Sequence, residues 1–151
     1  MREEKTTLNP RGRIVLDHHL FTREPTGRIE LQPRDLEVLL TAYEYRFADS
    51  RMLRIRTGHT GSDWAFQSRL LRLYREAYLD RPLRQVALRA LGEVRHLIYA
   101  LGRNGAKVLA ERFGEPLDHR RWTQKNEAGD LYIQHTLGVN TVRTCLHAAW
   151  P

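Results

Sequence analysis

The chain has 151 residues, of which 41% are hydrophobic and 28% charged, and its formal net charge is +7 at pH 7. This length predicts one domain, because a domain averages roughly 150 residues, and the composition excludes a mostly disordered protein. No stretch approaches the ~18 apolar residues of a membrane helix, and no apolar signal segment follows the N-terminal charges, so we expect a cytoplasmic protein that binds no membrane.

The first 30 residues predict an N-terminal arm with short strands. Arg13–Asp17 and Arg28–Leu31 are short runs that contain β-branched residues, and prolines and glycines lie beside them. Such runs are typical of extended segments with turns between them. We therefore expect the main domain to begin at residue 31 and to end at residue 114.

Three helices follow in the pattern of the sequence. Leucines and aromatic residues recur at steps of three and four over Pro33–Phe47, which predicts a first helix with proline in its first turn. Ala48–Thr57 predicts a short second helix, capped by Asp49 or Ser50, which must pack on the first because isolated helices below ~12 residues are marginal. After a turn bracketed by glycines, Asp63–Tyr78 has the strongest helical pattern of the chain, with arginines beside its apolar face.

Two strands are expected after the third helix. The first lies near Leu79–Leu83, and the second lies over Arg95–Leu101, where the apolar string HLIYAL ends at a glycine. A loop joins the two strands in this interpretation, although Val86–Leu91 also fits a turn of helix. The pair predicts a two-stranded hairpin.

The last part of the chain predicts two more helices. One covers Asn104–Phe113, and after a polar linker the other covers Leu131–Trp150, so residues 115–151 form a linker and a C-terminal helix. The apolar residues of this last helix favour the pairing of two chains over simple packing against the first helix. The residues expected at this dimer interface are Leu137, Val142, Cys145, Leu146 and Trp150.

The order of these elements is that of a winged helix-turn-helix with an additional C-terminal helix, a mainly α fold with a small β-hairpin. In that fold the third helix enters the major groove of DNA, and the hairpin contacts the neighbouring backbone or the minor groove. Residues 51–95 hold ten arginines and only four acidic residues, so the middle of the chain carries nearly all of the excess charge. We therefore expect a homodimer that binds double-stranded DNA. The expected DNA-binding residues are Arg51, Arg54, Arg56, Gln67, Arg69, Arg72, Arg75, Arg84, Arg89 and Arg95.

Other interpretations of the basic region stay open. Arginine outnumbers lysine 22 to 3 over the whole chain, so genomic base composition alone can produce the preference for arginine, although it does not explain the clustering. A solvated basic face on an ordinary helical domain would carry similar residues, and so would an adaptor that binds a protein through the same fold. RNA is a weaker candidate, because aromatic residues are not interleaved on the basic face.

Catalytic and metal-binding patterns have little support. Asp17, His18 and His19 form a string that some metal-dependent phosphoesterases contain, but the sequence lacks the further acidic and histidine clusters of such sites. His135 and Asn140 fit helix contacts better than catalysis, and the single cysteine cannot form an internal disulfide. No nucleophile elbow, phosphate-binding glycine loop or HExxH motif occurs. We expect no enzyme activity, no cofactor and no metal.

Three strings of the sequence resemble the replication-relaxation family, which are winged-helix proteins found on plasmids and mobile elements. They are SRLLRLYREAYLDR at Ser68–Arg81, LIYALGRNGAKVLAERFG at Leu97–Gly114 and HTLGVNTVRTCL at His135–Leu146. The first resembles the recognition helix and its exit, the second the wing strand with the next helix, and the third a helix with an early histidine and asparagine. The resemblance covers about Leu31–Ala149.

This resemblance implies a transcriptional regulator or an accessory factor in plasmid replication or mobilisation. By position, it aligns Gln67, Arg69 and Arg72 with the DNA-facing side of the recognition helix. Family members often continue into a further acidic segment, and we expect any activity of that segment to be absent here. The wing at Arg84–Arg95 is also richer in arginine, and more compatible with helix, than the family pattern implies.

Overall fold

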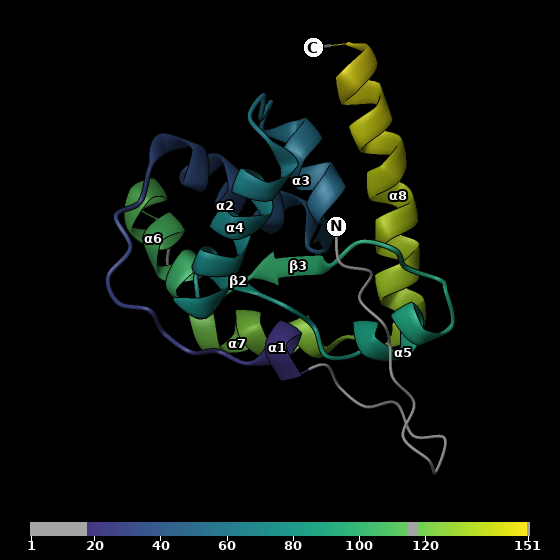
Figure 1. Ribbon diagram of the computed structural model, residues 1–151, viewed down its shortest axis with the longest axis horizontal. Coiled ribbons are helices and arrows are strands. Elements are labelled where there is room, and N and C mark those ends of the chain that lie inside the picture. The colour runs from purple at the N-terminus through teal and green to yellow at the C-terminus, as the bar shows by residue number, and fades with distance from the viewer. Residues whose placement is uncertain (1–17, 115–117, 151) are drawn as a thin grey trace.

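The computed structural model describes residues 18–114 and 118–150 and shows a mainly helical chain with one small sheet (Figure 1). The expected fold class, mainly α with a small β part, is confirmed. In chain order the elements are α1 (His18–Phe21), α2 (Pro33–Tyr45), β1 (Ala48–Asp49), α3 (Ser50–Arg56), α4 (Asp63–Arg75), β2 (Leu79–Asp80), α5 (Gln85–Ala90), β3 (Ile98–Leu101), α6 (Arg103–Phe113), α7 (His119–Gln124), the 3₁₀ turn η1 (Lys125–Glu127) and α8 (Asp130–Ala149).

The segment between α1 and α2 has no regular structure and runs around the edge of the body in Figure 1. Of the two extended runs predicted near the N-terminus, Arg13–Asp17 lies outside the described residues, and Arg28–Leu31 belongs to no helix or strand. Ile29 is nonetheless buried in the main core. The segment therefore packs along the body through this side chain.

The helices α2, α3 and α4 form where the sequence supplies both a start signal and an apolar face. Pro33 occupies the first position of α2. At the start of α3, Asp49 Oδ1 accepts a hydrogen bond from Met52 N at 2.9 Å, and at the start of α4, Ser62 Oγ accepts one from Ala65 N at 3.1 Å. The three predicted helices are confirmed, and each ends one to three residues earlier than the sequence pattern indicates.

Three short antiparallel strands form the sheet, in the order β1, β3, β2. Ala48 of β1 pairs with Tyr99 of β3, and Leu79 of β2 pairs with Leu101 on the other edge of β3. Both strands of the predicted hairpin are confirmed in shorter form. The third strand, β1, differs from the prediction, which includes its two residues in the second helix. Two residues are too few to show the alternating pattern of a strand.

The connection between β2 and β3 contains a helix where a plain loop was predicted. Its helix α5 begins at Gln85, so the alternative interpretation of Val86–Leu91 as a helical turn is the correct one. The fully buried Gln85 amide bonds the backbone of Ile98 twice, because Nε2 donates to the carbonyl O at 3.0 Å and Oε1 accepts from N at 2.8 Å. This side chain fixes α5 against the start of β3.

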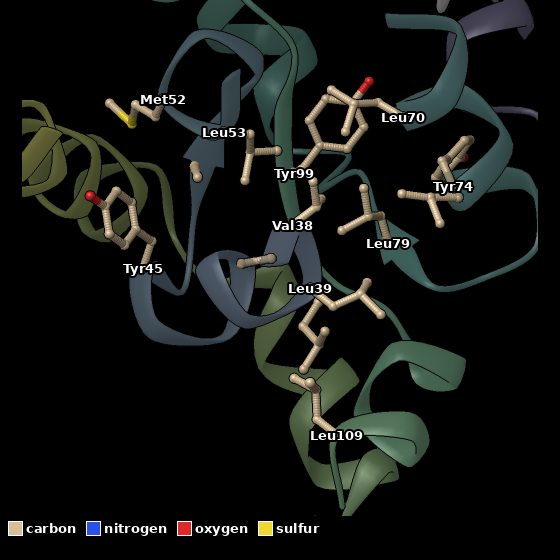
Figure 2. Packing of buried hydrophobic residues seen from close by; sticks show 14 of the residues in the cluster. Val38, Leu39, Tyr45, Met52, Leu53, Leu70, Tyr74, Leu79, Tyr99 and Leu109 are labelled. Carbon is tan, nitrogen blue, oxygen red and sulfur yellow. The ribbon is translucent and has the colours of Figure 1, made fainter. Parts of the chain in front are cut away.

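The main core lies where α2, α3, α4, α6 and the sheet meet (Figure 2). Close packing of α6 depends on its glycine, because a Cβ on Gly105 would lie 2.3 Å from the carbonyl O of Tyr78. Replacing a core leucine by alanine in such a cluster typically costs about 2–5 kcal/mol. The fully buried large side chains of this core are Leu39, Leu53, Phe66, Leu70, Leu73, Leu79, Tyr99 and Leu101.

A second, smaller core joins α5 and α8 to the sheet. Asn140 of α8 is buried there, and its Nδ2 donates to the carbonyl O of Tyr45 at 2.7 Å and of Phe47 at 2.8 Å. These bonds fix α8, which stands along one edge of the body in Figure 1 and confirms the predicted last helix to within one residue at each end. Neither α8 nor any other helix in residues 18–114 and 118–150 combines the length and apolar character needed to cross a bilayer. The buried apolar residues of the second core are Phe47, Leu88, Ile98, Ala100 and Ile133.

The predicted polar linker contains the short helix α7 and the turn η1 in its described part. The Arg46 guanidinium lies 4.5 Å from the ring centroid of Trp122 and donates to the Trp122 carbonyl O at 3.2 Å, and the Tyr43 ring lies 5.0 Å from the same indole. Burial lowers the pKa of Arg46. These contacts anchor α7 to α2. The predicted division of the chain at residues 30 and 114 stays a prediction.

Candidate nucleic-acid interface

A short turn joins α3 to α4, and side chains from both helices fix it. The turn covers residues 57–62. The ring of His59 lies 4.8 Å from the ring of Phe66 on α4. Arg54 of α3 donates through Nη1 to Asp63 Oδ1 at 3.2 Å. α4 is therefore held in one orientation relative to α3.

One side of α4 is anchored in the core and the opposite side faces solvent. Phe66, Leu70 and Leu73 are buried on the inner side. On the outer side, Trp64 is 79% exposed, and the exposed Arg72 forms no ion pair with any described residue. Ser68 and Arg75 on this side are half-buried, whereas Gln67 and Leu71 lie on the flank of the helix, where Leu71 packs against the main core.

Arg69 differs from the other arginines of α4 because its guanidinium is paired inside the fold. Its Nε donates to Asp35 Oδ1 at 2.9 Å, and its Nη2 donates to Asp35 Oδ2 at 2.5 Å and to the Glu30 carbonyl O at 2.8 Å. The hydrogen bond to Asp35 raises the pKa of Arg69. This two-point pairing ties α4 to the first turn of α2. Three of the five N–H groups of Arg69 are therefore used inside the fold.

The three predicted arginines of α3 have different surroundings. Arg54 is held by Asp63, as described above. Arg56 places Nη1 3.2 Å from Nδ1 of His147 on α8, and its Nη2 lies 3.9 Å from Glu44 Oε2. Arg51 is exposed, and its charge is not matched by an acidic side chain in the part of the chain that the structure describes.

The connection between β2 and β3 carries the last three predicted arginines. Arg84 precedes α5 and Arg95 follows it, and both are exposed. Arg89 is half-buried and donates through Nη1 to the Arg95 carbonyl O at 3.4 Å. Ser50 N at the start of α3 donates to the Leu97 carbonyl O at 3.1 Å. The start of α3, with Arg51, therefore lies beside the end of the connection, with Arg95.

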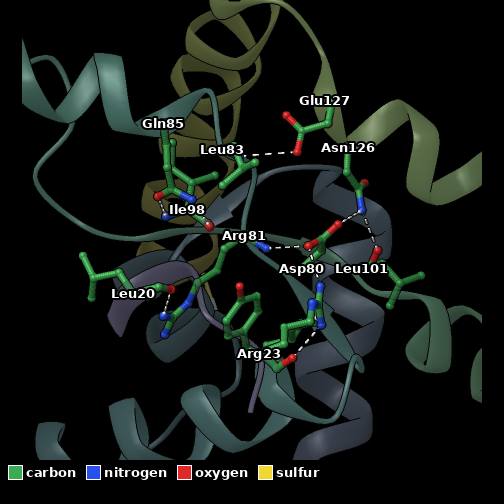
Figure 3. A network of polar contacts seen from close by, with 12 residues as sticks. Leu20, Arg23, Asp80, Arg81, Leu83, Gln85, Ile98, Leu101, Asn126 and Glu127 are labelled. Atoms are coloured by element: carbon green, nitrogen blue, oxygen red, sulfur yellow. Dashed lines mark hydrogen bonds and ion pairs between the residues drawn. The ribbon is translucent and has the colours of Figure 1, made fainter. Parts of the chain in front are cut away.

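A polar network that the sequence did not reveal holds the base of this connection (Figure 3). The buried Arg81 donates to the Leu20 carbonyl O at 2.5 Å and to a tyrosine hydroxyl of β3 at 2.8 Å. Asp80 Oδ1 accepts from Arg23 Nη2 at 2.6 Å, and its Oδ2 accepts from Asn126 Nδ2 at 3.0 Å. Because these partners of Asp80 and Arg81 lie 18 to 61 residues away along the chain, no local pattern could identify them.

A cavity of about 210 Å³ lies between α2 and α4. Its lining is largely apolar, with Val38, Phe66 and Leu70, and it includes the basic groups of Arg34 and His59. The carboxylate in its lining belongs to Asp35, which is paired with Arg69 of α4. Among the described residues, no three metal-binding side chains gather in one place.

The residues predicted for a dimer interface lie on α8 and at its C-terminal end, but they do not all face the same way. Val142, Leu146 and Trp150 are 60%, 58% and 82% exposed, and Cys145 is exposed as well. Leu137 instead turns toward the body, where it packs against both cores. Leu137 therefore does not belong to the outward surface.

Comparison with known families supports the resemblance predicted from the sequence. A sequence model described as replication-relaxation matches residues 39–150, a span that includes α3, α4, the sheet and α8. No curated protein and no solved structure matches the chain.

Proposed function

Because the chain belongs to the replication-relaxation family, we propose that it binds double-stranded DNA as a winged helix-turn-helix protein. Membership supports a role associated with replication or mobilisation. The finer proposal is an accessory factor of plasmid replication or mobilisation, or a transcriptional regulator, that acts in the cytoplasm as a pair of chains and without catalysis.

The proposal gives α4 the role of the reading helix. A helix suits the major groove when polar and basic side chains cover one side and the other side is anchored in a core. Arg72 lies on the outward side of α4, opposite its buried leucines, and the half-buried Gln67 lies on the flank between the two sides. The observation that carries the proposal is the position of Arg72, whose exposed guanidinium is unpaired within the described chain.

The connection between β2 and β3 takes the role of the wing. Arg84 and Arg95 are exposed on it, and Arg51 is exposed on the neighbouring start of α3. Exposed arginines on adjacent segments suit the phosphates beside a groove, which position a protein without reading its sequence. The arginines already paired inside the fold are left out of the proposed contact.

Trp64 favours a second candidate function, that of a protein-binding adaptor. Its side chain is 79% exposed at the start of α4, and Leu91 is 75% exposed just after α5. Aromatic side chains are enriched at protein interfaces relative to the rest of the surface. In this alternative the surface around these side chains binds a protein, and duplex DNA does not compete for it.

A mobility-shift titration with random-sequence duplex separates these two candidates. If Arg51, Arg84 and Arg95 each neutralise one phosphate, affinity should fall about 40-fold between ~50 and ~200 mM salt, because each contact releases counterions. The adaptor alternative expects no such binding. The absence of salt-sensitive duplex binding at the lower salt concentration would contradict the DNA proposal.

Arg72→Ala tests the role of α4 directly. We expect the affinity for duplex DNA to fall by about 1–3 kcal/mol, roughly 5- to 150-fold in Kd, with the fold unchanged. The slope of log affinity against log salt should fall by about one if Arg72 contacts a phosphate and stay constant if it contacts a base. The matched control is Arg112→Ala, which removes an exposed arginine from the last turn of α6 and should leave Kd unchanged. Equal losses in both variants would mean that overall charge drives binding.

A further inference from the structure

An apolar stripe lies on the solvent-exposed side of α8, with two members in the first turn and four from Val139 onward. Its large apolar side chains, including the residue that caps the helix, are 48% to 83% exposed. With 3.6 residues per turn they all fall within an arc of about 100°, opposite the buried Ile133, Asn140 and Thr144. The stripe consists of Leu131, Tyr132, Val139, Val142, Leu146 and Trp150.

The area of this stripe matches that of a stable interface. The exposed parts of its side chains amount to on the order of 700 Å², above the ~300–600 Å² of the largest apolar patch on a typical monomer. Each partner in a standard interface buries ~800 Å². The stripe is therefore large enough to hold one partner without help from another surface.

Charge indicates the chemistry of that partner. Residues 131–150 include one arginine, no lysine and no acidic residue, in a chain that is 28% charged. The arginine, Arg143, is directed to the body, because its guanidinium lies 4.5 Å from the ring centroid of Tyr45 and its Nη1 donates to the Glu44 carbonyl O at 3.3 Å. Nucleic acid or a charged peptide would find no counter-charge on the stripe. A second α8 would bring an equally uncharged, apolar surface.

The spacing of the outward positions fits a second copy that runs in the opposite direction. Six exposed positions recur at alternating steps of four and three residues, which is the heptad spacing of paired helices. They lie two, five and nine residues on either side of Asn140. A twofold antiparallel pairing centred there brings every position opposite another member of the set. The positions are Leu131, His135, Gly138, Val142, Cys145 and Ala149.

This register places large side chains against small ones. Val142 meets the partner's Gly138, where an added Cβ would find nothing within 4 Å. Leu131 meets the partner's Ala149. The antiparallel arrangement also sets the positive end of each helix dipole beside the negative end of the other. In a parallel pair the same positions would face themselves, with glycine against glycine and leucine against leucine.

We propose that two chains pair through α8 as an antiparallel dimer, with the twofold axis at the level of Asn140. Trp150 then covers the first turn of the partner helix, and Leu146 packs beside the seam. The pairing goes beyond the proposed DNA binding and does not depend on it, so each can fail alone.

The native cysteine allows the register to be tested by cross-linking. In the antiparallel dimer, Cys145 lies opposite the partner's His135, while the two copies of Cys145 are separated by about 15 Å along the helix axis, too far for a disulfide. His135→Cys should therefore give a covalent dimer with a mild oxidant on a non-reducing gel, whereas the wild type should not. Ala148→Cys, on an exposed position off the stripe, is the matched control and should behave as the wild type.

Three cross-linking results would overturn the register. They are a wild-type dimer linked through Cys145, which indicates a parallel pair, no cross-link in His135→Cys, and equal cross-linking in Ala148→Cys.

The dimer itself is tested by sedimentation of the full chain without DNA. The wild type should have about twice the 17.7 kDa chain mass at micromolar concentration. Val142→Glu should shift it to the mass of one chain, because two carboxylates would be buried at the seam without partners. Thr141→Glu adds the same charge at the adjacent exposed residue, off the seam, and should leave the dimer intact. A wild-type monomer, or equal dissociation in both variants, would overturn the proposal.

Discussion

The pair between Arg69 and Asp35 fixes α4 to α2 at the scale of single residues. Asp35 is 2% exposed, so its carboxylate is hydrated poorly and relies on protein donors. Two of these come from Arg69, and a third is Gln32 N at 2.7 Å. Arg72, three residues later, makes no comparable contact with the described chain. The two arginines therefore have different roles, one in the fold and one in the proposed interface.

Arg69→Ala should lower the free energy of unfolding by about 1–3 kcal/mol, because Asp35 would lose two of its hydrogen bonds while staying buried. Urea titration followed by circular dichroism measures this change. Arg72→Ala serves as the control and should stay within about 0.5 kcal/mol of the wild type. An equally small effect of both substitutions would mean that the Asp35 pair adds nothing to stability.

This division of roles could not be predicted from the sequence. The pattern places Arg69 and Arg72 on the sides of the same helix, and the family resemblance aligns both with its DNA-facing side. Asp35 lies 34 residues before Arg69, and only the packing of α2 against α4 brings the two together. Residue type and spacing identified the basic region, but the pairing of individual arginines depends on tertiary contacts.

At the scale of elements, the connection between β2 and β3 depends on the amide of Gln85. This side chain satisfies both backbone polar groups of Ile98 at the first residue of β3, as a further strand would. Leu88 of α5 packs into the second core beneath it. The connection proposed as the wing is therefore fixed to the sheet by these contacts.

Gln85→Leu should loosen this element while the rest of the fold stays formed. The substitution leaves the N–H and the carbonyl of Ile98 buried without partners, which costs about 1–3 kcal/mol for each group. Hydrogen exchange should show faster exchange of the Ile98 amide, while the amides in the middle of α2 keep their protection. Arg84→Ala, at the exposed neighbouring residue, should change neither. Unchanged protection of Ile98 in Gln85→Leu would contradict this role.

The long helices were predicted from their periodicity, whereas β1 was missed and α5 was only an alternative interpretation, for a physical reason. α2 and α4 have 13 residues each, enough for the helical period to repeat, and α8 has 20. β1 has two residues and α5 has six, and both depend on partners from β3 for their stability. Periodicity reports burial along one element and cannot report a pairing that lies elsewhere in the chain.

At the scale of the whole molecule, positive charge and apolar surface are separated on different elements. The exposed arginines proposed to contact DNA lie on α3, α4 and the β2–β3 connection, and the uncharged stripe lies on α8. The sequence predicted both locations, from the charge of residues 51–95 and from the periodicity of the last helix. It did not predict that Leu137 faces inward or that Arg56 contacts His147. These two contacts join α8 to the rest of the fold together with the hydrogen bonds of Asn140.

The three tryptophans of the chain give each of these regions an optical reporter. Trp64 and Trp150 are 79% and 82% exposed, on α4 and at the end of α8, whereas Trp122 is stacked between its neighbours. With two of the three replaced by phenylalanine, the emission of Trp64 should respond to duplex DNA alone, and that of Trp150 to protein concentration alone. Trp122 should emit at shorter wavelength and respond to neither. Fluorescence can thus follow DNA binding and chain pairing independently in the same sample.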